Sequence, residues 1–240
     1  MRSSPTPTAV AESVFPRAVL FDLDGTLLDS APDMLATANA MLAARGRVPI
    51  TLDALRPVVS KGSRAMVAVA FPELGQDARD ALVPEFLDRY EALIGQHAVL
   101  FDGVAGMLDA LEAGGCRWGI VTNKPEYLAQ LILPQLGWEM RCAVLIGGDT
   151  LAQRKPHPLP LLAAAERMGI DPATCIYVGD DERDIVAANA AGMASVAALW
   201  GYRLDEDNPL AWGAEAMVEQ PAALQQAATW PAARNNATSR

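Results

Sequence analysis

Short apolar runs alternate along this chain with longer segments whose apolar positions recur at helical spacing. The strand candidates are Ala18 to Phe21, Trp118 to Val121, Ala143 to Ile146, Ile176 to Val178 and Ala194 to Leu199. Helical spacing is found near residues 104–114, 126–136, 159–168 and 182–191. Alternating strands and helices predict a parallel sheet covered on both faces. Because such connections are right-handed, we expect an α/β fold with a Rossmann-like, doubly wound parallel sheet.

One interval interrupts the alternation. Between about Ala31 and Leu100 there is no convincing strand, and helical patterns cover residues 33–44, 63–71 and 77–96. Pro84 is expected to kink or divide the last of these helices. Ser30, with Asp33 three residues later and Pro32 in the first turn, predicts a capping box at the start of the interval.

These patterns divide the chain into a core and an inserted helical part. The predicted units are a mobile N-terminal segment (1–16), an α/β core (17–30 and 101–230), an inserted helical domain (31–100) and a mobile tail (231–240). The two ends are rich in small and polar residues, which is typical of mobile termini.

Composition narrows the range of partners. The formal net charge is -10, which opposes general binding to nucleic acid or to an anionic membrane. No apolar stretch approaches the length of a membrane span, and the first 16 residues lack the apolar segment of a secretion signal, so we expect a cytoplasmic protein. Cys116, Cys142 and Cys175 are odd in number and widely spaced, which favours buried free thiols.

Asp22 and Asp24 directly follow the first apolar run. Side chains two residues apart on a strand project to the same face, so the two carboxylates are expected to share one site. Charges at the edge of a core are stabilised by pairing, by hydrogen bonds or by a metal. The pair therefore indicates a functional site at the end of the first strand.

Further polar clusters follow other predicted strands. Thr122 and Asn123 follow the second, Asp180, Asp181 and Asp184 follow the fourth, and Lys155 lies in the loop between the third and fourth. Ligands of open α/β sheets collect outside the carboxyl ends of the strands. We therefore expect these clusters to converge on one crevice.

The full set of motifs resembles the haloacid dehalogenase-like phosphohydrolases over roughly residues 17 to 220. The matching stretches are Asp22-Leu23-Asp24-Gly25-Thr26, Val121-Thr122-Asn123, Lys155-Pro156 and Gly179-Asp180-Asp181-Glu182-Arg183-Asp184. A single pair of spaced aspartates is a weak signal, whereas the complete set in this order is specific. The resemblance implies a phosphatase whose helical insertion is a C1-type cap over a small soluble substrate.

Residue chemistry agrees with that activity. A carboxylate is ionised at neutral pH, and its acyl phosphate can be hydrolysed by water, so Asp22 is the expected nucleophile. Asp24 is expected to protonate the leaving group and then to activate water, which requires a raised pKa in the site. Lys155, the Thr122 hydroxyl and the Asn123 amide are expected to neutralise and bind the phosphoryl oxygens.

The resemblance also implies a magnesium ion, held by the Asp22 carboxylate, the Asp24 carbonyl and the Asp180 carboxylate. Asp184 is interpreted as a partner of Lys155 or of metal-bound water, and Asp181 as an alternative ligand. Acidic residues at this position are also typical of a helix start, so helix capping stays open for both.

Lys61 and Arg64 open a helix of the insertion, and two interpretations stay open for them. They form either a solvated basic turn or a loop that binds an anionic part of the substrate. Residues 29–33 resemble phosphoglycolate phosphatases, whereas residues 59–71 and 200–213 resemble N-acetylmuramic acid 6-phosphate phosphatases. Both substrates carry a carboxylate, for which Lys61, Arg64 or Arg203 would supply a cation.

The expected partner is thus a small phosphorylated metabolite, in a monomer or homodimer, with the amino-sugar acid as the favoured chemical substrate. The alternatives are a phosphonatase that uses Lys61 as a Schiff base, a hexose-phosphate mutase, and a member that binds phosphorylated metabolites without catalysis. Asp24 argues against a haloacid dehalogenase, which needs no second acid in this motif.

Overall fold

The computed structural model describes residues 15–234. Residues 1–14 and 235–240 lie outside this range, so the two termini predicted to be mobile fall largely outside the described residues. In the described part, no helix is both long and apolar enough to cross a membrane.

A six-stranded parallel sheet forms the centre of the larger part of the molecule, which confirms the predicted fold class. Its strand order is β5-β4-β1-β6-β7-β8. The strands are β1 (Ala18–Phe21), β4 (Arg117–Val121), β5 (Leu145–Ile146), β6 (Cys175–Gly179), β7 (Ala194–Ala198) and β8 (Ala216–Val218). The sequence patterns did not predict β8, which is a short edge strand with Met217 exposed.

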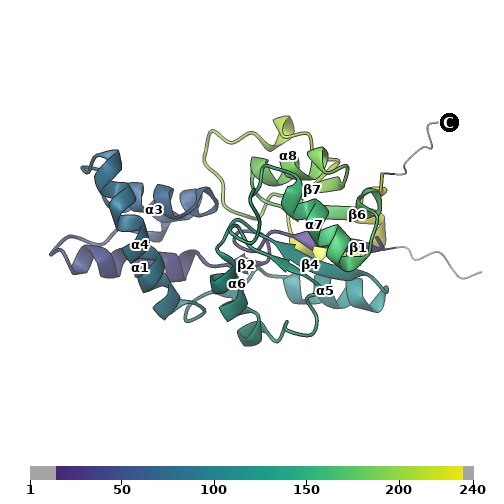
Figure 1. Cartoon of the computed structure of the whole chain (residues 1–240), viewed down its shortest axis with the longest axis horizontal. Coiled ribbons are helices and arrows are strands. Elements are labelled where there is room, and N and C mark those ends of the chain that lie inside the picture. Colours follow the sequence, from purple (N-terminus) through teal and green to yellow (C-terminus); the bar gives the residue numbers. More distant parts are fainter. Residues whose placement is uncertain (1–14, 235–240) are drawn as a thin grey trace, which may run out of the picture.

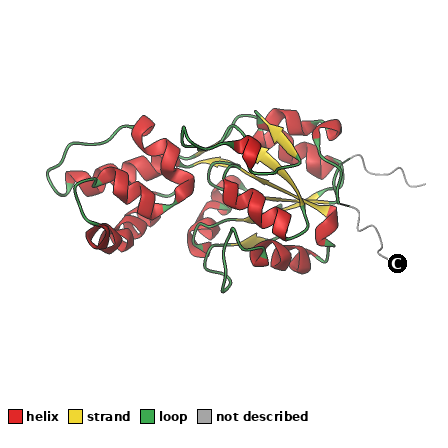
Figure 2. Cartoon of the chain, turned by 90° about the horizontal axis from the view of Figure 1, so that it is seen from above, coloured by secondary structure: helices red, strands yellow, loops and turns green. Residues whose placement is uncertain are grey.

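Helices cover both faces of this sheet (Figure 2). They are α5 (Val104–Ala113), α6 (Glu126–Ile132), α7 (Leu159–Met168) and α8 (Glu182–Ala190). Strand β1 is apolar throughout because both of its faces are buried. Val19 and Phe21 belong to one buried cluster and Ala18 and Leu20 to another, so each face of the strand is packed.

Four helices between β2 and β3 form a separate bundle beside the sheet, which we call the helical unit (Figure 1). They are α1 (Ala31–Ala43), α2 (Leu52–Leu55), α3 (Ser63–Ala70) and α4 (Gln76–Leu93). Helix α4 continues through Pro84, so the expected division does not occur. Phe86 and Tyr90, which follow the proline on the same helix, are almost fully buried, and their packing offsets the lost backbone hydrogen bond.

A short antiparallel ribbon joins the helical unit to the sheet. It pairs β2 (Leu28–Asp29) with β3 (Val99–Leu100). The sequence analysis was wrong to expect no strand before Leu100. Two residues are too few to give an alternating pattern, and Val99 is exposed, so the segment carries little apolar signal.

The capping box expected at Ser30 and Asp33 is also absent from the structure. Ser30 is the N-cap residue of α1, but its hydroxyl donates to Asp24 and not to the helix. The Asp33 carboxylate accepts hydrogen bonds from the backbone N–H groups of Gly95 and His97. Both side chains therefore bind residues outside α1 and help to fix the connection between the two units.

Candidate active site

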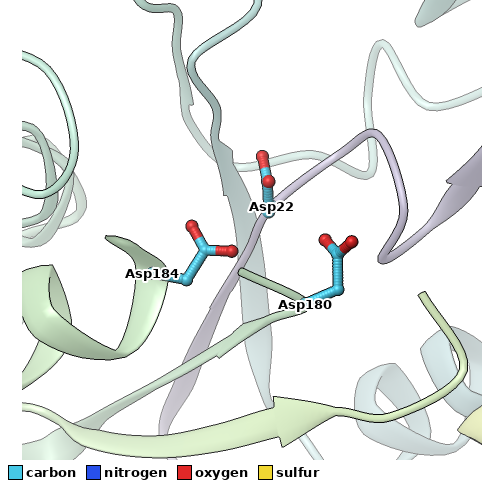
Figure 3. Close-up of side chains that lie close together, drawn as sticks. All are labelled: Asp22, Asp180 and Asp184. Atoms are coloured by element: carbon cyan, nitrogen blue, oxygen red, sulfur yellow. The ribbon is translucent and has the colours of Figure 1, made fainter. Parts of the chain in front are cut away.

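The carboxyl ends of β1 and β6 bring three aspartates together. Asp22 follows β1 and Asp180 follows β6, while Asp184 lies in the first turn of α8. Figure 3 shows the three side chains close together, and one oxygen from each lies within 4.8 Å of the others. All three residues are buried. The sequence thus correctly indicated that separate motifs meet at this edge of the sheet.

Lys155 lies against two of these acids. Its Nζ is 3.0 Å from Asp22 Oδ1 and 2.7 Å from Asp184 Oδ1, and it also donates to the Tyr177 hydroxyl at 2.7 Å. Burial by itself would lower the pKa of Lys155, but Asp184 and Asp22 outweigh it and raise the pKa. Lys155 therefore stays cationic. Asp184 takes the role of its partner, which was one of the two interpretations made from the sequence.

Asp180 is held by three donors from different parts of the chain. Its carboxylate accepts from the Thr26 hydroxyl at 3.0 Å, the Ser60 hydroxyl at 2.8 Å and the Tyr202 backbone N–H at 2.9 Å. Burial, followed by repulsion from Asp22 and Asp184, raises the pKa of Asp180 well above its usual range. Burial also raises the pKa of Asp184, to about 6. Three carboxylates beside one ammonium therefore repel one another, and a divalent cation between them would relieve that repulsion.

This donor set fits a hard divalent cation. Buried carboxylate oxygens within a few ångströms of one another are the ligands that Mg²⁺ takes in proteins, together with water and substrate oxygens. In the described part of the chain, Asp22 forms an ion pair with Lys155 alone, and Asp180 forms none. Both carboxylates would therefore remain available as ligands. The Asp24 carboxylate does not join the three, and its expected contribution through the carbonyl is a separate prediction.

The Asp24 side chain lies in a different environment. Its Oδ1 accepts from the Ser30 hydroxyl at 2.6 Å and from Lys124 Nζ at 3.1 Å, and its Oδ2 accepts from the same Nζ at 3.0 Å. The sequence analysis missed Lys124. The available signal was its place directly after Thr122 and Asn123 at the end of β4, where a cation meets the same crevice.

Thr122 and Asn123 line the same cavity as Asp22 and Asp24. The Thr122 hydroxyl accepts from the Lys124 backbone N–H at 3.2 Å. Asn123 Nδ2 donates to the Lys155 carbonyl at 2.9 Å and so ties the two loops together. Asn123 Oδ1 is buried without a hydrogen-bond partner, which is costly unless a bound molecule supplies a donor.

The basic residues of the helical unit have partners in the structure. Lys61 Nζ lies 2.9 Å from Asp181 and 3.1 Å from Asp207, whereas the exposed Arg64 lies 3.1 Å from Asp80. Lys61 therefore links the helical unit to the sheet. Because core carboxylates pair with its ammonium, Lys61 is not a solvated turn residue, and the binding of a substrate anion by Lys61 stays a prediction.

Asp181 caps a helix, which is one of the two roles, metal ligation and helix capping, that the sequence left open. It is the N-cap residue of α8 and forms a capping box with Asp184. Burial opposes its ionisation, but hydrogen bonds from Arg183 and Lys61 lower its pKa to about 2. Its side chain is thus fully engaged in capping and ion pairing, which leaves little reason to assign it as a metal ligand.

A cavity of about 460 Å³ lies between the sheet and the helical unit. Its polar wall includes Asp22, Asp24, Thr122, Asn123, Lys124 and Arg154. Its apolar wall comes chiefly from the helical unit and includes Met66, Val83, Phe86 and Leu87. A bound molecule would meet the strand-end acids at one side and apolar side chains at the other.

Comparison with protein families decides the classification. The family model described as haloacid dehalogenase-like hydrolase matches residues 19–198. This chain belongs to that family. The resemblance inferred from the four motifs is therefore confirmed, and the matched range contains every strand-end residue described above.

The relatives of this haloacid dehalogenase-like hydrolase include phosphatases that are named for two different substrates. A phosphoglycolate phosphatase of Xanthomonas campestris pv. campestris (strain 8004) is 74% identical over 217 residues, which cover 90% of this chain and 98% of the relative. An N-acetylmuramic acid 6-phosphate phosphatase of Pseudomonas putida is 46% identical over 213 residues, which cover 88% of this chain and 95% of the relative.

Solved structures agree with the classification. A crystal structure described as a predicted phosphoglycolate phosphatase from Haemophilus somnus 129PT matches with a TM-score of 0.76 and 27% identity. The match covers 88% of this hydrolase and 97% of that chain, so it includes the helical unit as well as the sheet.

Proposed function

We propose that this enzyme hydrolyses a small, carboxylate-bearing phosphomonoester with the help of Mg²⁺ and through an aspartyl-phosphate intermediate. Its family and its relatives make it a phosphoric monoester hydrolase. The observation that carries the proposed mechanism is the convergence of Lys155 and the Asp180 and Asp184 carboxylates around Asp22, which itself lines the cavity.

Asp22 is the proposed nucleophile. The Leu23 N–H donates to its Oδ1 at 2.8 Å, and Lys155 contacts the same oxygen. Within residues 15–234, no donor contacts Oδ2, so this oxygen keeps its lone pairs for attack on phosphorus. The two contacts on Oδ1 hold the carboxylate in place, which lowers the entropic cost of reaching the transition state.

The other groups stabilise the charge of the phosphoryl group. Asp22 and Asp180 would hold Mg²⁺, which supplies positive charge beside the phosphoryl oxygens. Lys155 adds a fixed cation, and Thr122 and Asn123 offer a hydroxyl and an amide at the cavity wall. Asp24 delivers a proton to the leaving oxygen and later removes one from the attacking water.

The shape of the cavity supports the larger of the two candidate substrates. Phosphoglycolate has only two carbons and no apolar group, whereas N-acetylmuramic acid 6-phosphate carries acetyl and lactyl methyl groups on a sugar ring. A cavity of about 460 Å³ with Val83, Phe86 and Leu87 in its wall offers apolar surface that the smaller acid would leave unused. We therefore propose the amino-sugar acid as the preferred substrate.

Arg154 is the proposed partner of the substrate carboxylate. It lines the cavity next to Lys155 and has no acidic partner among residues 15–234. Lys61 is bound by two carboxylates, and Arg203 donates to the Leu199 carbonyl. Arg64 also lines the cavity, but its ion pair with Asp80 competes with a substrate. The pairing of Lys61 likewise disfavours the phosphonatase alternative, which needs a free amine.

A substrate panel tests this function. Phosphate release from phosphoglycolate and from N-acetylmuramic acid 6-phosphate is measured with added Mg²⁺ and with a chelator. We expect Mg²⁺-dependent release, with the higher kcat/KM for the amino-sugar acid. Asp22→Asn should abolish release, whereas Asp109→Asn, the same change at an exposed residue of α5, should not. Release that survives Asp22→Asn would overturn the mechanism, and equal or better use of phosphoglycolate would overturn the substrate preference.

A further inference from the structure

Lys124 is a buried cation in the cavity wall that has no role in the reaction as described so far. Its side chain is 2% exposed. Its Nζ lies 3.1 Å and 3.0 Å from the two oxygens of Asp24, and 2.7 Å from the Tyr90 hydroxyl. A buried ammonium is costly unless it is paired and hydrogen-bonded, and these contacts satisfy it. The chain therefore holds this charge at one defined place beside Asp24.

The contacts of Lys124 fix the direction of the Asp24 carboxylate. The Ser30 hydroxyl holds Oδ1 at 2.6 Å, and the ammonium contacts both oxygens from another direction. Ser30 alone would leave the carboxylate free to turn about its bond to Cβ. A general acid must lie within hydrogen-bond reach of the leaving oxygen, so this second anchor bears directly on proton delivery.

Tyr90 connects this arrangement to the helical unit. It lies on α4, is 1% exposed, and receives a hydrogen bond from Lys124, which belongs to the sheet part of the molecule. The ammonium also lies 4.4 Å from the centre of the Tyr90 ring. A buried tyrosine hydroxyl needs a polar partner, so the two side chains stabilise each other only while the helical unit is closed on the sheet.

We propose that Lys124 is a positioning residue that holds Asp24 for proton transfer to the leaving oxygen, and that Tyr90 makes this arrangement depend on closure of the helical unit. The inference rests on the proposed phosphatase function. As the bond from Asp22 Oδ2 to phosphorus forms, the bond from phosphorus to the leaving oxygen breaks, and that oxygen takes the proton of Asp24. Lys124 contacts both oxygens of Asp24 and Ser30 contacts Oδ1 as well, so Oδ2 has fewer donors and is the oxygen assigned to proton transfer.

The need for this proton depends on the leaving group, and this dependence gives the test. An alkyl phosphate releases an alkoxide that must be protonated, whereas p-nitrophenyl phosphate releases a stable phenolate. The readout is kcat/KM, because it reports transfer of the phosphoryl group to Asp22 and not the later hydrolysis of the aspartyl phosphate, in which Asp24 acts on water whatever the ester. Since general acid catalysis contributes about 10²- to 10⁴-fold, we expect Lys124→Met to lower kcat/KM for an alkyl ester such as N-acetylmuramic acid 6-phosphate by about 100-fold. For the aryl ester, kcat/KM should fall by less than about tenfold.

Tyr90→Phe gives a second test that does not require Lys124 to be replaced. It removes one hydroxyl and keeps the ring, so folding should be preserved. We expect a smaller loss, about 10-fold in kcat/KM, again confined to the alkyl ester. Tyr127→Phe is the matched control, because it removes the hydroxyl of a partly exposed tyrosine on α6, and it should leave both esters unaffected.

Two results would overturn the positioning role. They are equal losses of kcat/KM on both esters, and wild-type kinetics in Lys124→Met and Tyr90→Phe. The first would show that Lys124 binds the phosphoryl group or maintains the fold. If the wild-type enzyme released phosphate from neither ester, the proposed function itself would fail, and the inference with it.

Discussion

Gly201 packs so closely against Asp180 that a single added methyl group tests how this carboxylate is placed. A Cβ atom at Gly201 would lie 2.2 Å from Asp180 Cβ and 2.4 Å from the Gly25 carbonyl oxygen. Ordinary contact begins at 3.4 Å, so both contacts must open by about 1 Å, through a shift of residue 201 or of its neighbours. Asp180 is fully buried and Gly25 presents backbone, so neither can turn away into solvent.

The consequence of Gly201→Ala should be larger for catalysis than for stability. Overpacking of a buried contact costs about 1–3 kcal/mol, which would lower the midpoint of thermal unfolding by several degrees. A displacement of about 1 Å in a catalytic group can cost about 100-fold in rate. If Asp180 holds the metal, we expect kcat/KM to fall by about this factor and the Mg²⁺ concentration for half-maximal activity to rise.

The assay is phosphate release measured over a range of Mg²⁺ concentrations, together with a thermal melt of each variant. Gly75→Ala is the matched control. Gly75 has a φ of -69° and no atom within 4 Å of an added Cβ, so alanine fits there without strain. Wild-type kinetics and Mg²⁺ dependence in Gly201→Ala would refute the assigned role of Asp180. Equal losses in both variants would refute the steric argument.

Three further predictions concern the cap contact, the thiols and an acid-dependent ion pair. Lys61→Met removes an ion pair with Asp181 that is worth about 1 kcal/mol and that links the helical unit to the sheet. Because the cavity lies between these two parts, KM should rise about fivefold, and an unchanged KM would contradict the linking role. Burial raises the pKa of Cys116 to about 12 and the pKa values of Cys142 and Cys175 to about 11. In the folded protein, none of the three thiols should react quickly with a disulfide reagent at pH 8, whereas all three should react after unfolding. The hydrogen bond from Arg45 lowers the pKa of Glu85 from 4.5 to about 2. Arg45→Met should therefore lower the free energy of unfolding in urea by less than about 1 kcal/mol at pH 7, and this difference from the wild type should shrink as the pH falls from 4.5 to 2. A difference that stays constant over this range would disprove the role of the pair.

The sheet could be predicted because buried parallel strands are apolar on both faces and therefore form continuous runs. Ala18 to Phe21 is such a run, and the structure places it in the middle of the sheet. The strands that were missed are short and partly exposed, as Val99 and Met217 show. Their pairing depends on neighbours distant in sequence, and a pattern read along the chain does not contain that information.

The same limit separates the site residues that were found from those that were missed. Asp22, Lys155 and Asp180 could be grouped because strand ends meet at one edge of a parallel sheet, whatever the loops do. Ser60 was missed because its contact with Asp180 depends on where the helical unit rests, whereas Lys124 had a sequence signal in its place directly after Thr122 and Asn123. Locally, Ser30 and Asp33 fit a capping box, but tertiary partners outcompete the helix end for both side chains.

The sheet part and the helical unit contribute different kinds of side chain to the cavity, and this difference explains why the reaction is easier to infer than the substrate. The charged groups that face the proposed phosphoryl site, Asp22, Lys155 and Asp180, all come from the sheet part, where topology fixes their relation. The helical unit reaches Asp180 with a neutral hydroxyl, that of Ser60, and the rest of its cavity wall is largely apolar apart from Lys61, Ser63 and Arg64. Charged residues at strand ends leave a specific sequence pattern, whereas apolar residues on a helix have the same spacing whether they face a core or a substrate. Discrimination between the two candidate acids therefore depends on side chains such as Phe86 and Leu87, whose role becomes visible only once the two units are placed together.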